Sequence, residues 1–298
     1  MGSSSHWTST ATEIGTAAEI GTALRSAGAE RRALVLAAGV GRRLLPMTSE
    51  RPKGLIEVRG VPLLWGILDG LKRAGIRQCV LVVGHRRELI QAAVESWRFD
   101  SMRIRWVVNE DFAATNTLHS VARAARELAG APFVLVNGDL WARPEVFDRA
   151  LTPRFVASGG PLRVGLTIAV DRRVRLDAEA MKVSVDTEGR VRRVSKQLAL
   201  EHAAGESIGV YSFDTSSGAC FLSRVLELAR EGNAGAFYEA ALDQLLQQGM
   251  VAHLVDVPAR CWVEVDDHTD LARARRLASG RVLTRSAGGD LAHARAGP

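Results

Sequence analysis

The sequence predicts an α/β protein in which a doubly wound, mostly parallel sheet carries a small antiparallel extension. Its first half alternates short apolar runs, typical of buried strands, with longer amphipathic stretches, typical of helices. This alternation predicts βαβ units, whose helices cover both faces of a parallel sheet. The strands are expected at residues 33–38, 79–83, 103–108 and 133–136, and the helices at 63–74, 88–96 and 117–128.

The second half of the chain has a different pattern, in which several strand-like segments follow one another with only short turns between them. One of these turns is Thr187-Glu188-Gly189. Consecutive strands joined by short turns predict antiparallel pairing. Strands are expected at residues 164–170, 181–186, 191–195, 207–213, 253–257 and 262–265, and helices at 221–231, 237–248 and 268–277.

The composition along the 298 residues predicts one folded domain between two less regular ends. Residues 1–31 form a leader rich in Ser, Thr, Ala and Gly, and residues 284–298 form a loose Gly/Ala-rich tail. The domain is expected at 32–283, with halves at 32–150 and 151–283. The N-terminus has no basic leader followed by an apolar run, and no apolar run is long enough to span a membrane. We therefore expect a cytoplasmic protein without membrane association.

The charge of the chain is basic but does not indicate a nucleic-acid partner. The net charge of +6 and the pI near 9.8 come mainly from arginines, which are spread along predicted helices and interleaved with acidic residues. The sequence shows no platform of alternating aromatic and basic residues. Cys79, Cys220 and Cys261 are far apart and lack the spacing of a zinc or redox site, so they are expected to be buried thiols.

A glycine-rich string after the first predicted strand is the strongest functional signal. Small residues there let backbone N–H groups approach a phosphate closely. Arg43 can bind phosphate oxygens as a fork, and Lys53 adds a compact positive charge. In the alternative interpretation the glycines only form a tight turn between strand and helix, and both cations are solvated. The residues that could contact such a phosphate, and so form the candidate nucleotide-binding set once the resemblance below is considered, are Ala37, Ala38, Gly39, Gly41, Arg43 and Lys53.

Two aspartates at the ends of predicted strands form a candidate metal site. Asp139 follows the strand at 133–136, and Asp266 follows the strand at 262–265. Ligands gather at the carboxyl edge of open α/β sheets, and carboxylates are suitable ligands for Mg²⁺. Alternatively, Asp139 is a turn residue and Asp266 is a helix N-cap. The neighbouring acids Glu264, Asp267 and Asp270 are expected to be structural.

The glycine-rich string and its continuation resemble the LAAGxGxRxxPxTxxxPK signature of the nucleotidyltransferase superfamily, which activates sugar phosphates and small phospho-alcohols. The matching residues are Leu36-Ala37-Ala38-Gly39-Val40-Gly41-Arg42-Arg43-Leu44, then Pro46, Thr48 and Arg51-Pro52-Lys53. The resemblance implies a Rossmann-like nucleotidyltransferase fold, with the loop around a triphosphate and Arg43 and Lys53 on its phosphates. It also implies Mg²⁺ on Asp139 and Asp266.

A second string indicates a subfamily. The segment from Asn109-Glu110-Asp111-Phe112 through Asn116 and Thr117 to Ser120 resembles the phosphocholine and phosphonate cytidylyltransferases. Side-chain amides and hydroxyls can read a base edge by hydrogen bonds, so Asn109, Asn116 and Thr117 are expected to bind the nucleotide. Asn116 is equally well placed to be a helix N-cap, and the two roles are compatible.

The same resemblance extends to the second half of the chain and implies an acceptor site there. It places Lys196 on the phosphate of the acceptor and a Tyr-Glu pair, Tyr238 and Glu239, beside it. Glu206 and Tyr211 complete the expected acceptor residues, and Trp141, Tyr211 and Tyr238 are candidates for an aromatic cage around choline. We expect Lys182, which stands beside a predicted turn, to be a simple exposed lysine.

Together these resemblances imply transfer of CMP from CTP to a small phospho-alcohol or phosphonate, with release of pyrophosphate. Phosphocholine, 2-aminoethylphosphonate and 2-hydroxyethylphosphonate are the acceptor types considered, and the sequence does not choose among them. One alternative is a sugar-1-phosphate nucleotidyltransferase that uses UTP, dTTP, GTP or ATP. Another is a relative that senses nucleotides without catalysis, although pure binding does not require the two metal-binding aspartates.

Overall fold

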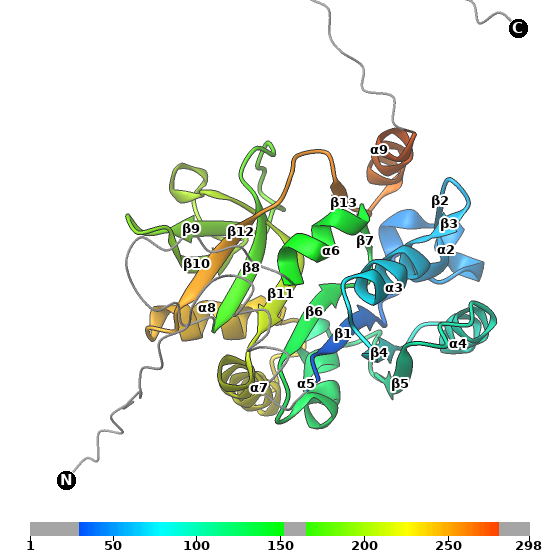
Figure 1. Cartoon of the computed structure of the whole chain (residues 1–298), viewed down its shortest axis with the longest axis horizontal. Helices are drawn as coiled ribbons and strands as arrows, with labels where there is room; N and C mark the ends of the chain where they lie inside the picture. The colour runs from blue at the N-terminus through cyan, green and yellow to red at the C-terminus, as the bar shows by residue number, and fades with distance from the viewer. Residues whose placement is uncertain (1–29, 152–164, 280–298) are drawn as a thin grey trace, which may run out of the picture.

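The computed structural model describes residues 30–151 and 165–279, which form one mixed sheet covered by helices (Figure 1). The sheet has nine strands in the order β5-β4-β1-β6-β11-β8-β12-β10-β9. The predicted leader and tail lie outside the described residues, apart from Glu30 and Arg31 at the start. The strands of the sheet are β1 (Arg32–Ala37), β4 (Gln78–Val83), β5 (Arg103–Val108), β6 (Phe133–Asn137), β8 (Leu166–Asp171), β9 (Lys182–Val185), β10 (Arg190–Ser195), β11 (Gly205–Phe213) and β12 (Ala252–Asp256).

The first half of the sheet is parallel, which confirms the predicted βαβ organisation. Strand β1 pairs in parallel with β4 on one side and with β6 on the other, and β4 pairs in parallel with β5. Along the chain, β4 and β5 are added on one side of β1, and β6 is then added on its other side. The strand order therefore has a switch point between β1 and β6. The connecting helices are α3 (Leu63–Arg73), α4 (Arg87–Ser96) and α5 (Thr117–Leu128).

The second half is more than the small antiparallel extension that the sequence predicted. Strand β11 is nine residues long and pairs antiparallel with β6, with β8 and, through Gly205 and Glu206, with β9. This last pairing closes β11, β8, β12, β10 and β9 into a ring of five strands. A register shift between Ser207 and Tyr211, together with a positive φ at Gly209, bends β11 so that it can take part in both the open sheet and the ring.

Helices cover both faces of the sheet and divide the core into two layers (Figure 1). On one face, α5 packs with α7 (Thr215–Arg230) and α8 (Glu239–Gln247) around Phe133, Phe213 and Phe221. On the other face, α3, α4 and α6 (Pro144–Leu151) bury aliphatic residues and Phe147. Cys79 is buried as expected, whereas Cys220 and Cys261 are only partly buried.

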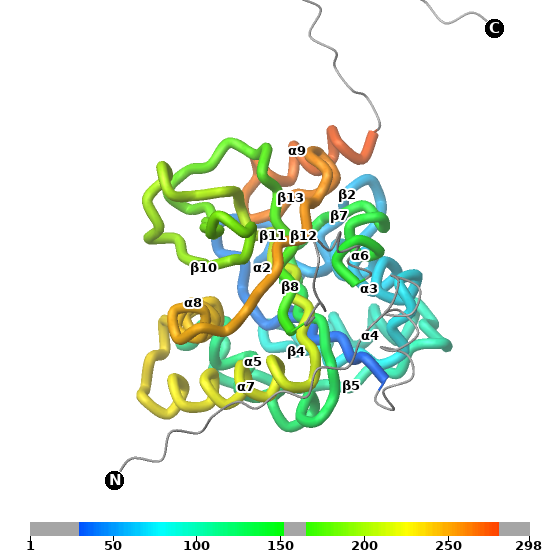
Figure 2. Tube along the Cα trace, turned by 60° about the vertical axis from the view of Figure 1, so that its left-hand side comes forward, coloured from blue at the N-terminus to red at the C-terminus, as the bar shows by residue number. Residues whose placement is uncertain are grey.

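A third, smaller core lies beside the carboxyl ends of the central strands, and the sequence analysis did not predict it. It joins the hairpin of β2 (Glu57–Val58) and β3 (Val61–Pro62) to the pair formed by β7 (Leu140–Ala142) and β13 (Trp262–Glu264) and to α9 (His268–Ala278). Figure 2 shows α9 and β13, from the end of the folded region, beside β7 and β2. No helix in the described ranges has the length and apolarity needed to cross a membrane.

Candidate active site

The switch in strand order between β1 and β6 brings two functional segments together. In open α/β sheets ligands bind at such a switch point, beyond the carboxyl ends of the strands. Gly138 follows β6 and donates its N–H to the carbonyl of Leu36 in β1 (3.0 Å). A Cβ at residue 138 would lie 2.2 Å from that carbonyl oxygen, so only glycine allows this approach. The next residue, Asp139, is thereby placed beside the glycine-rich loop.

The loop after β1 is fixed by its own polar contacts. Gly41 has a φ of 70° and precedes the short 3-10 helix η1 (Arg42–Leu44), which carries Arg43. The buried hydroxyl of Thr48 donates to the carbonyl of Gly41 (2.9 Å). A second 3-10 helix, η2 (Lys53–Leu55), begins with the predicted lysine. The signature residues thus build a loop and place two cations at its mouth.

Gly39 is not required by the fold. No heavy atom of the described residues lies within 4 Å of the position that a Cβ at residue 39 would occupy, and its φ is not in the left-handed region. The open space above this backbone suits the close approach of a ligand.

We expect Gly39→Ala to leave the thermal midpoint unchanged and to raise the KM for the nucleotide about tenfold, equivalent to losing one charge-assisted hydrogen bond. Gly138→Ala is the contrasting variant, because its methyl group would clash with the Leu36 carbonyl and destabilise the fold. Thermal melts and steady-state kinetics separate the two cases. An unchanged KM in Gly39→Ala would remove the loop from phosphate binding.

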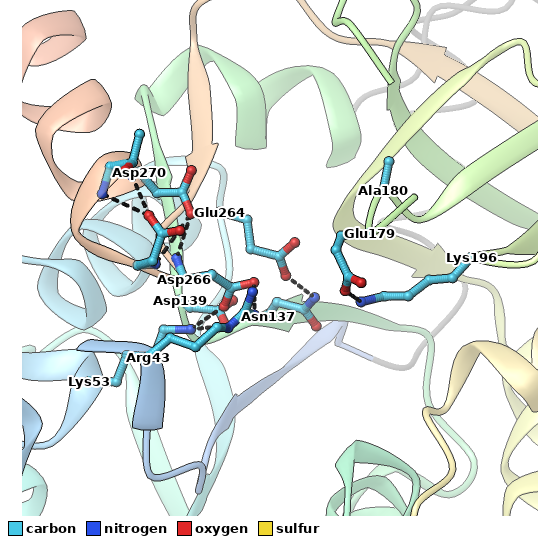
Figure 3. A network of polar contacts seen from close by, with 12 residues as sticks. Arg43, Lys53, Asn137, Asp139, Glu179, Ala180, Lys196, Glu264, Asp266 and Asp270 are labelled. Atoms are coloured by element: carbon cyan, nitrogen blue, oxygen red, sulfur yellow. Dashed lines mark hydrogen bonds and ion pairs between the residues drawn. The ribbon is translucent and has the colours of Figure 1, made fainter. Parts of the chain in front are cut away.

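Lys53 connects the two predicted metal ligands (Figure 3). Its ammonium donates to Oδ2 of Asp139 (2.7 Å) and to Oδ1 of Asp266 (2.6 Å). Arg43 donates to the other oxygen of Asp266, also at 2.6 Å. Asp139 and Asp266 are more than a hundred positions apart in the sequence and meet here because β13 pairs with β7 and the N–H of Val265 bonds to the carbonyl of Asp139.

The charges in this cluster stabilise one another. Burial alone would lower the pKa of Lys53, but Asp139 and Asp266 outweigh it and raise that pKa above its ordinary value. Burial would raise the pKa of Asp266, but Lys53 and Arg43 outweigh it and lower that pKa. At neutral pH Lys53 is therefore an ammonium and Asp266 an ionised carboxylate.

The donor set is suitable for a magnesium ion. Oδ1 of Asp139 is buried and has no hydrogen-bond partner, and the carboxylate of Asp266 stands across the same ammonium. Among the described residues, no group of three or more His, Cys, Asp or Glu side chains forms a complete metal site. Mg²⁺ is commonly bound by one or two carboxylates with phosphates and water completing its shell. Asp139 and Asp266 fit that pattern.

The acidic residues around Asp266 have separate structural tasks. Asp267, rather than Asp266, is the N-cap of α9: its side chain accepts from the N–H groups of Thr269 and Asp270. Asp270 completes a capping box. The structural interpretation of Asp267 and Asp270 is confirmed, and the alternative that Asp266 caps the helix is wrong. Asp266 remains available to face Lys53.

Sequence reasoning did not single out Asn137 and expected Glu264 to be structural, and the structure places both beside the Lys53 cluster. The amide of Asn137 accepts from the hydroxyl of Tyr238 (2.8 Å) and donates to Glu264 (3.2 Å). A Cβ on Gly209 would lie 2.5 Å from the same amide, so the bend in β11 also packs against it. Burial, with the carboxylates of Asp139 and Asp266, raises the pKa of Glu264 to about 8. The sequence signal was available, because Asn137 is a polar residue at the end of a buried strand.

The residues predicted to read the base organise one corner of the molecule. Asn109 is buried, and its amide contacts Thr115, Ser120, Arg123 and the N–H of Asp111. A base could bind Asn109 only by displacing some of these bonds. Asn116 is the N-cap of α5, as its alternative interpretation predicted, and its amide also donates to the carbonyl of Gly235.

The base segment and the Tyr-Glu pair lie together in space. The hydroxyl of Thr117 accepts from the N–H of Tyr238 (3.3 Å), and the N–H of Asn116 donates to the carbonyl of Ala234 (2.8 Å). The start of α5 is therefore fixed to the segment that leads into α8. This contact connects the predicted nucleotide and acceptor halves.

The candidate aromatic cage does not form among the described residues. Tyr211 and Tyr238 are fully buried and contact each other edge to face, and Trp141 lies in the separate core around β7. Tyr211 donates to Glu239 (3.3 Å), whose other oxygen is buried without a hydrogen-bond partner. Burial raises the pKa of Glu239 to about 7. Tyr211, Tyr238 and Glu239 are thus buried polar residues, and Tyr238 joins them to the site through its bond to Asn137.

Lys182 and Glu206 occupy a different neighbourhood from the Lys53 cluster. The expectation that Lys182 is exposed is wrong, because the residue is only 2% exposed and donates to three backbone carbonyls. Glu206 pairs with Lys182 across β11 and β9. Burial, with the nearby charge of Asp177, raises the pKa of Glu206 to about 7. Lys196 reaches from the turn after β10 to Glu179 (3.3 Å).

Known proteins resemble this chain in both sequence and fold. Residues 33–165 match the MobA-like NTP transferase domain. The chain is 34% identical over 253 residues to the CMP-5'-(3-aminopropyl)phosphonate synthase of Streptomyces rubellomurinus, covering 82% of this chain and 38% of that protein. It is 31% identical over 121 residues to the choline-phosphate cytidylyltransferase of Streptococcus pneumoniae, covering 41% of this chain and 50% of that protein. The chain thus spans half or less of the length of these two relatives.

A solved structure extends the likeness to nearly the whole described region. The inositol-1-phosphate CTP transferase of T. maritima superposes with a TM-score of 0.67 at 22% identity, covering 86% of this chain and 99% of that one. At this identity the match establishes the α/β fold alone.

Proposed function

We propose that this chain is a member of the nucleotidyltransferase superfamily, and that it is a cytidylyltransferase acting on a small phospho-alcohol or phosphonate. The observation that carries the proposal is the contact of Lys53 with both Asp139 and Asp266 beside an open glycine-rich loop. Two cations and two carboxylates at one switch point suit a nucleoside triphosphate with its metal. The relatives named for CMP-phosphonate synthesis and choline-phosphate cytidylyl transfer support CTP as the nucleotide.

The reaction is a direct displacement at the α-phosphorus. An acceptor oxygen forms the new bond to this phosphorus, the bond to the bridging oxygen breaks, and pyrophosphate leaves with the electron pair. Lys53 and Arg43 stabilise negative charge on the phosphates as pyrophosphate departs. Asp139 and Asp266 would hold Mg²⁺, which when bound neutralises phosphate charge. No side chain needs to form a covalent intermediate.

One assay tests this proposal. The full chain is incubated with MgCl₂, each of CTP, UTP, dTTP, GTP and ATP in turn, and a panel of acceptors, and pyrophosphate release is measured. The panel contains phosphocholine, 2-aminoethylphosphonate, 2-hydroxyethylphosphonate, inositol 1-phosphate and glucose 1-phosphate. We expect release that is selective for CTP, requires a phospho-alcohol or phosphonate, and stops when EDTA removes the metal.

Two outcomes would contradict the proposal. Release with UTP or dTTP and glucose 1-phosphate would assign the chain to the sugar-phosphate enzymes. Nucleotide binding without release for any pair would favour a sensor. Calorimetric titration of each nucleotide in the presence of MgCl₂ identifies the second outcome.

A further inference from the structure

An exposed ion pair on the ring side of the molecule combines both charges of a zwitterion. Lys196 and Glu179 are 3.3 Å apart, with side chains 35% and 77% exposed. The ammonium of Lys196 also lies over the ring of Phe237, 5.1 Å from its centroid. Phe237 is itself exposed. Both partners are accessible to a ligand because their side chains are partly exposed. An exposed ion pair also contributes little to stability, so the two residues can exchange their mutual contact for a ligand at little cost.

The loop that carries Glu179 is unusually well built for a surface segment. Asp177 accepts from the N–H groups of Glu179 and Ala180 at 2.9 and 3.0 Å. The ammonium of Lys182 is buried beneath the loop and donates to the carbonyls of Asp177, Ala178 and Ala180, each at 3.2 Å. A buried lysine is costly unless its donors are satisfied. These bonds therefore hold Glu179 in a defined place.

This ion pair faces the candidate active site. In Figure 3 the head groups of Glu179 and Lys196 point toward Asn137 and Glu264, whose neighbours are Asp139 and Asp266. Phe237, under the ammonium of Lys196, is followed by Tyr238, whose hydroxyl donates to Asn137, and Asn137 donates to Glu264. The segment at Phe237 and Tyr238 thus connects the ion pair to the neighbours of the Lys53 cluster.

We propose that Glu179 and Lys196 exchange their mutual contact for a zwitterionic acceptor: Lys196 binds its phosphate or phosphonate, and Glu179 binds its primary ammonium. The inference rests on the proposed cytidylyl transfer and narrows its acceptor class. Lys182 is then a positioning residue, because it shapes the loop that carries Glu179.

A primary ammonium fits these residues better than a quaternary one. It has three N–H donors, and a carboxylate has free lone pairs to accept them. A quaternary ammonium has no N–H and is best held by several aromatic faces. Tyr211 and Tyr238 are buried, which leaves Phe237 as the exposed ring next to Lys196 among the described residues.

The test compares two acceptors that differ only at the end facing Glu179. Pyrophosphate release is measured for wild type and Glu179→Gln with CTP and either 2-aminoethylphosphonate or 2-hydroxyethylphosphonate. We expect the KM for the amino compound to rise at least about tenfold in the variant, since a hydrogen bond to a charged group is lost. The KM for the hydroxy compound and the kcat for both should change less than about twofold.

Glu188→Gln is the matched control. Glu188 is also an exposed glutamate paired with a neighbouring cation, Arg190 (3.2 Å), in a turn of the same half. The variant Glu188→Gln should leave the KM values for the amino and the hydroxy compound unchanged. Equal effects of Glu179→Gln on the two acceptors, or no effect on either, would overturn the proposal.

Calorimetric titration of 2-aminoethylphosphonate separates this inference from the proposed function. Binding that weakens in Glu179→Gln, in a protein that releases no pyrophosphate, would support the zwitterion site while rejecting cytidylyl transfer. CTP-dependent turnover by wild type with 2-hydroxyethylphosphonate or phosphocholine, but not with the amino compound, would support cytidylyl transfer while rejecting the zwitterion site.

Discussion

Lys53→Ala is expected to lower kcat at least about a hundredfold, which is the typical contribution of one charge-stabilising donor at a reacting phosphate or carbonyl. Lys53 is the only lysine that contacts both Asp139 and Asp266 among the described residues. When a triphosphate enters the glycine-rich loop, the ammonium of Lys53 is the nearest compact positive charge available to the phosphates. Steady-state pyrophosphate release measures the effect, and Lys72→Ala is the control because Lys72 stacks on Phe99 instead.

The same substitution should also change stability and metal binding. It leaves Asp139 and Asp266 close together without their shared cation. The expected loss is roughly 2 kcal/mol, below the 3–5 kcal/mol of a fully buried pair, because these side chains are 23% and 28% exposed. MgCl₂ should therefore raise the melting temperature of Lys53→Ala more than that of wild type, since the ion binds the folded state. Turnover like that of wild type would remove Lys53 from the mechanism.

The sequence predicted the parts of the site that belong to a contiguous string. The loop from Leu36 to Lys53 folds on itself, so its turn residues and cations could be recognised from local spacing. The position of Asp139 also followed from a local rule, since it stands where a buried strand ends. These predictions needed no knowledge of how distant segments pair.

The contacts that the sequence did not predict depend on long-range packing. The meeting of Asp266 with Lys53 requires the predicted strand β13 to pair with β7, and β7 has only three residues, too few to give a periodic signal. The burial of Lys182 depends on three carbonyls in a loop that no pattern marks. The closed ring depends on β9 returning to β11, which alternation of apolar residues in either strand cannot reveal.

The caps at the start of α9 show how closely function and local structure can be interleaved. Asp266 and Asp267 are adjacent acids before one helix, and either could have been the cap. The structure assigns the cap to Asp267 and directs Asp266 toward Lys53 and Arg43. This division of roles supplies a sharp control for the metal site.

Asp139→Asn is expected to abolish metal-dependent turnover. The substitution preserves size and leaves an oxygen that can accept from Lys53, but it removes the negative charge that a hard divalent cation requires. Even outer-shell partners of a metal ligand typically contribute about 10–100-fold in affinity, so a magnesium titration should shift by at least that factor. Asp266→Asn should behave in the same way.

Asp267→Asn provides the matched control, because asparagine caps a helix about as well as aspartate. It should retain the stability, the kcat and the magnesium dependence of wild type, although it lies next to Asp266. Binding of Mn²⁺, followed by electron paramagnetic resonance without nucleotide or acceptor, gives a readout that does not depend on turnover. If Asp139→Asn and Asp267→Asn had the same Mn²⁺ affinity as wild type, Asp139 would not be a metal ligand, and Lys53 would be its functional partner instead.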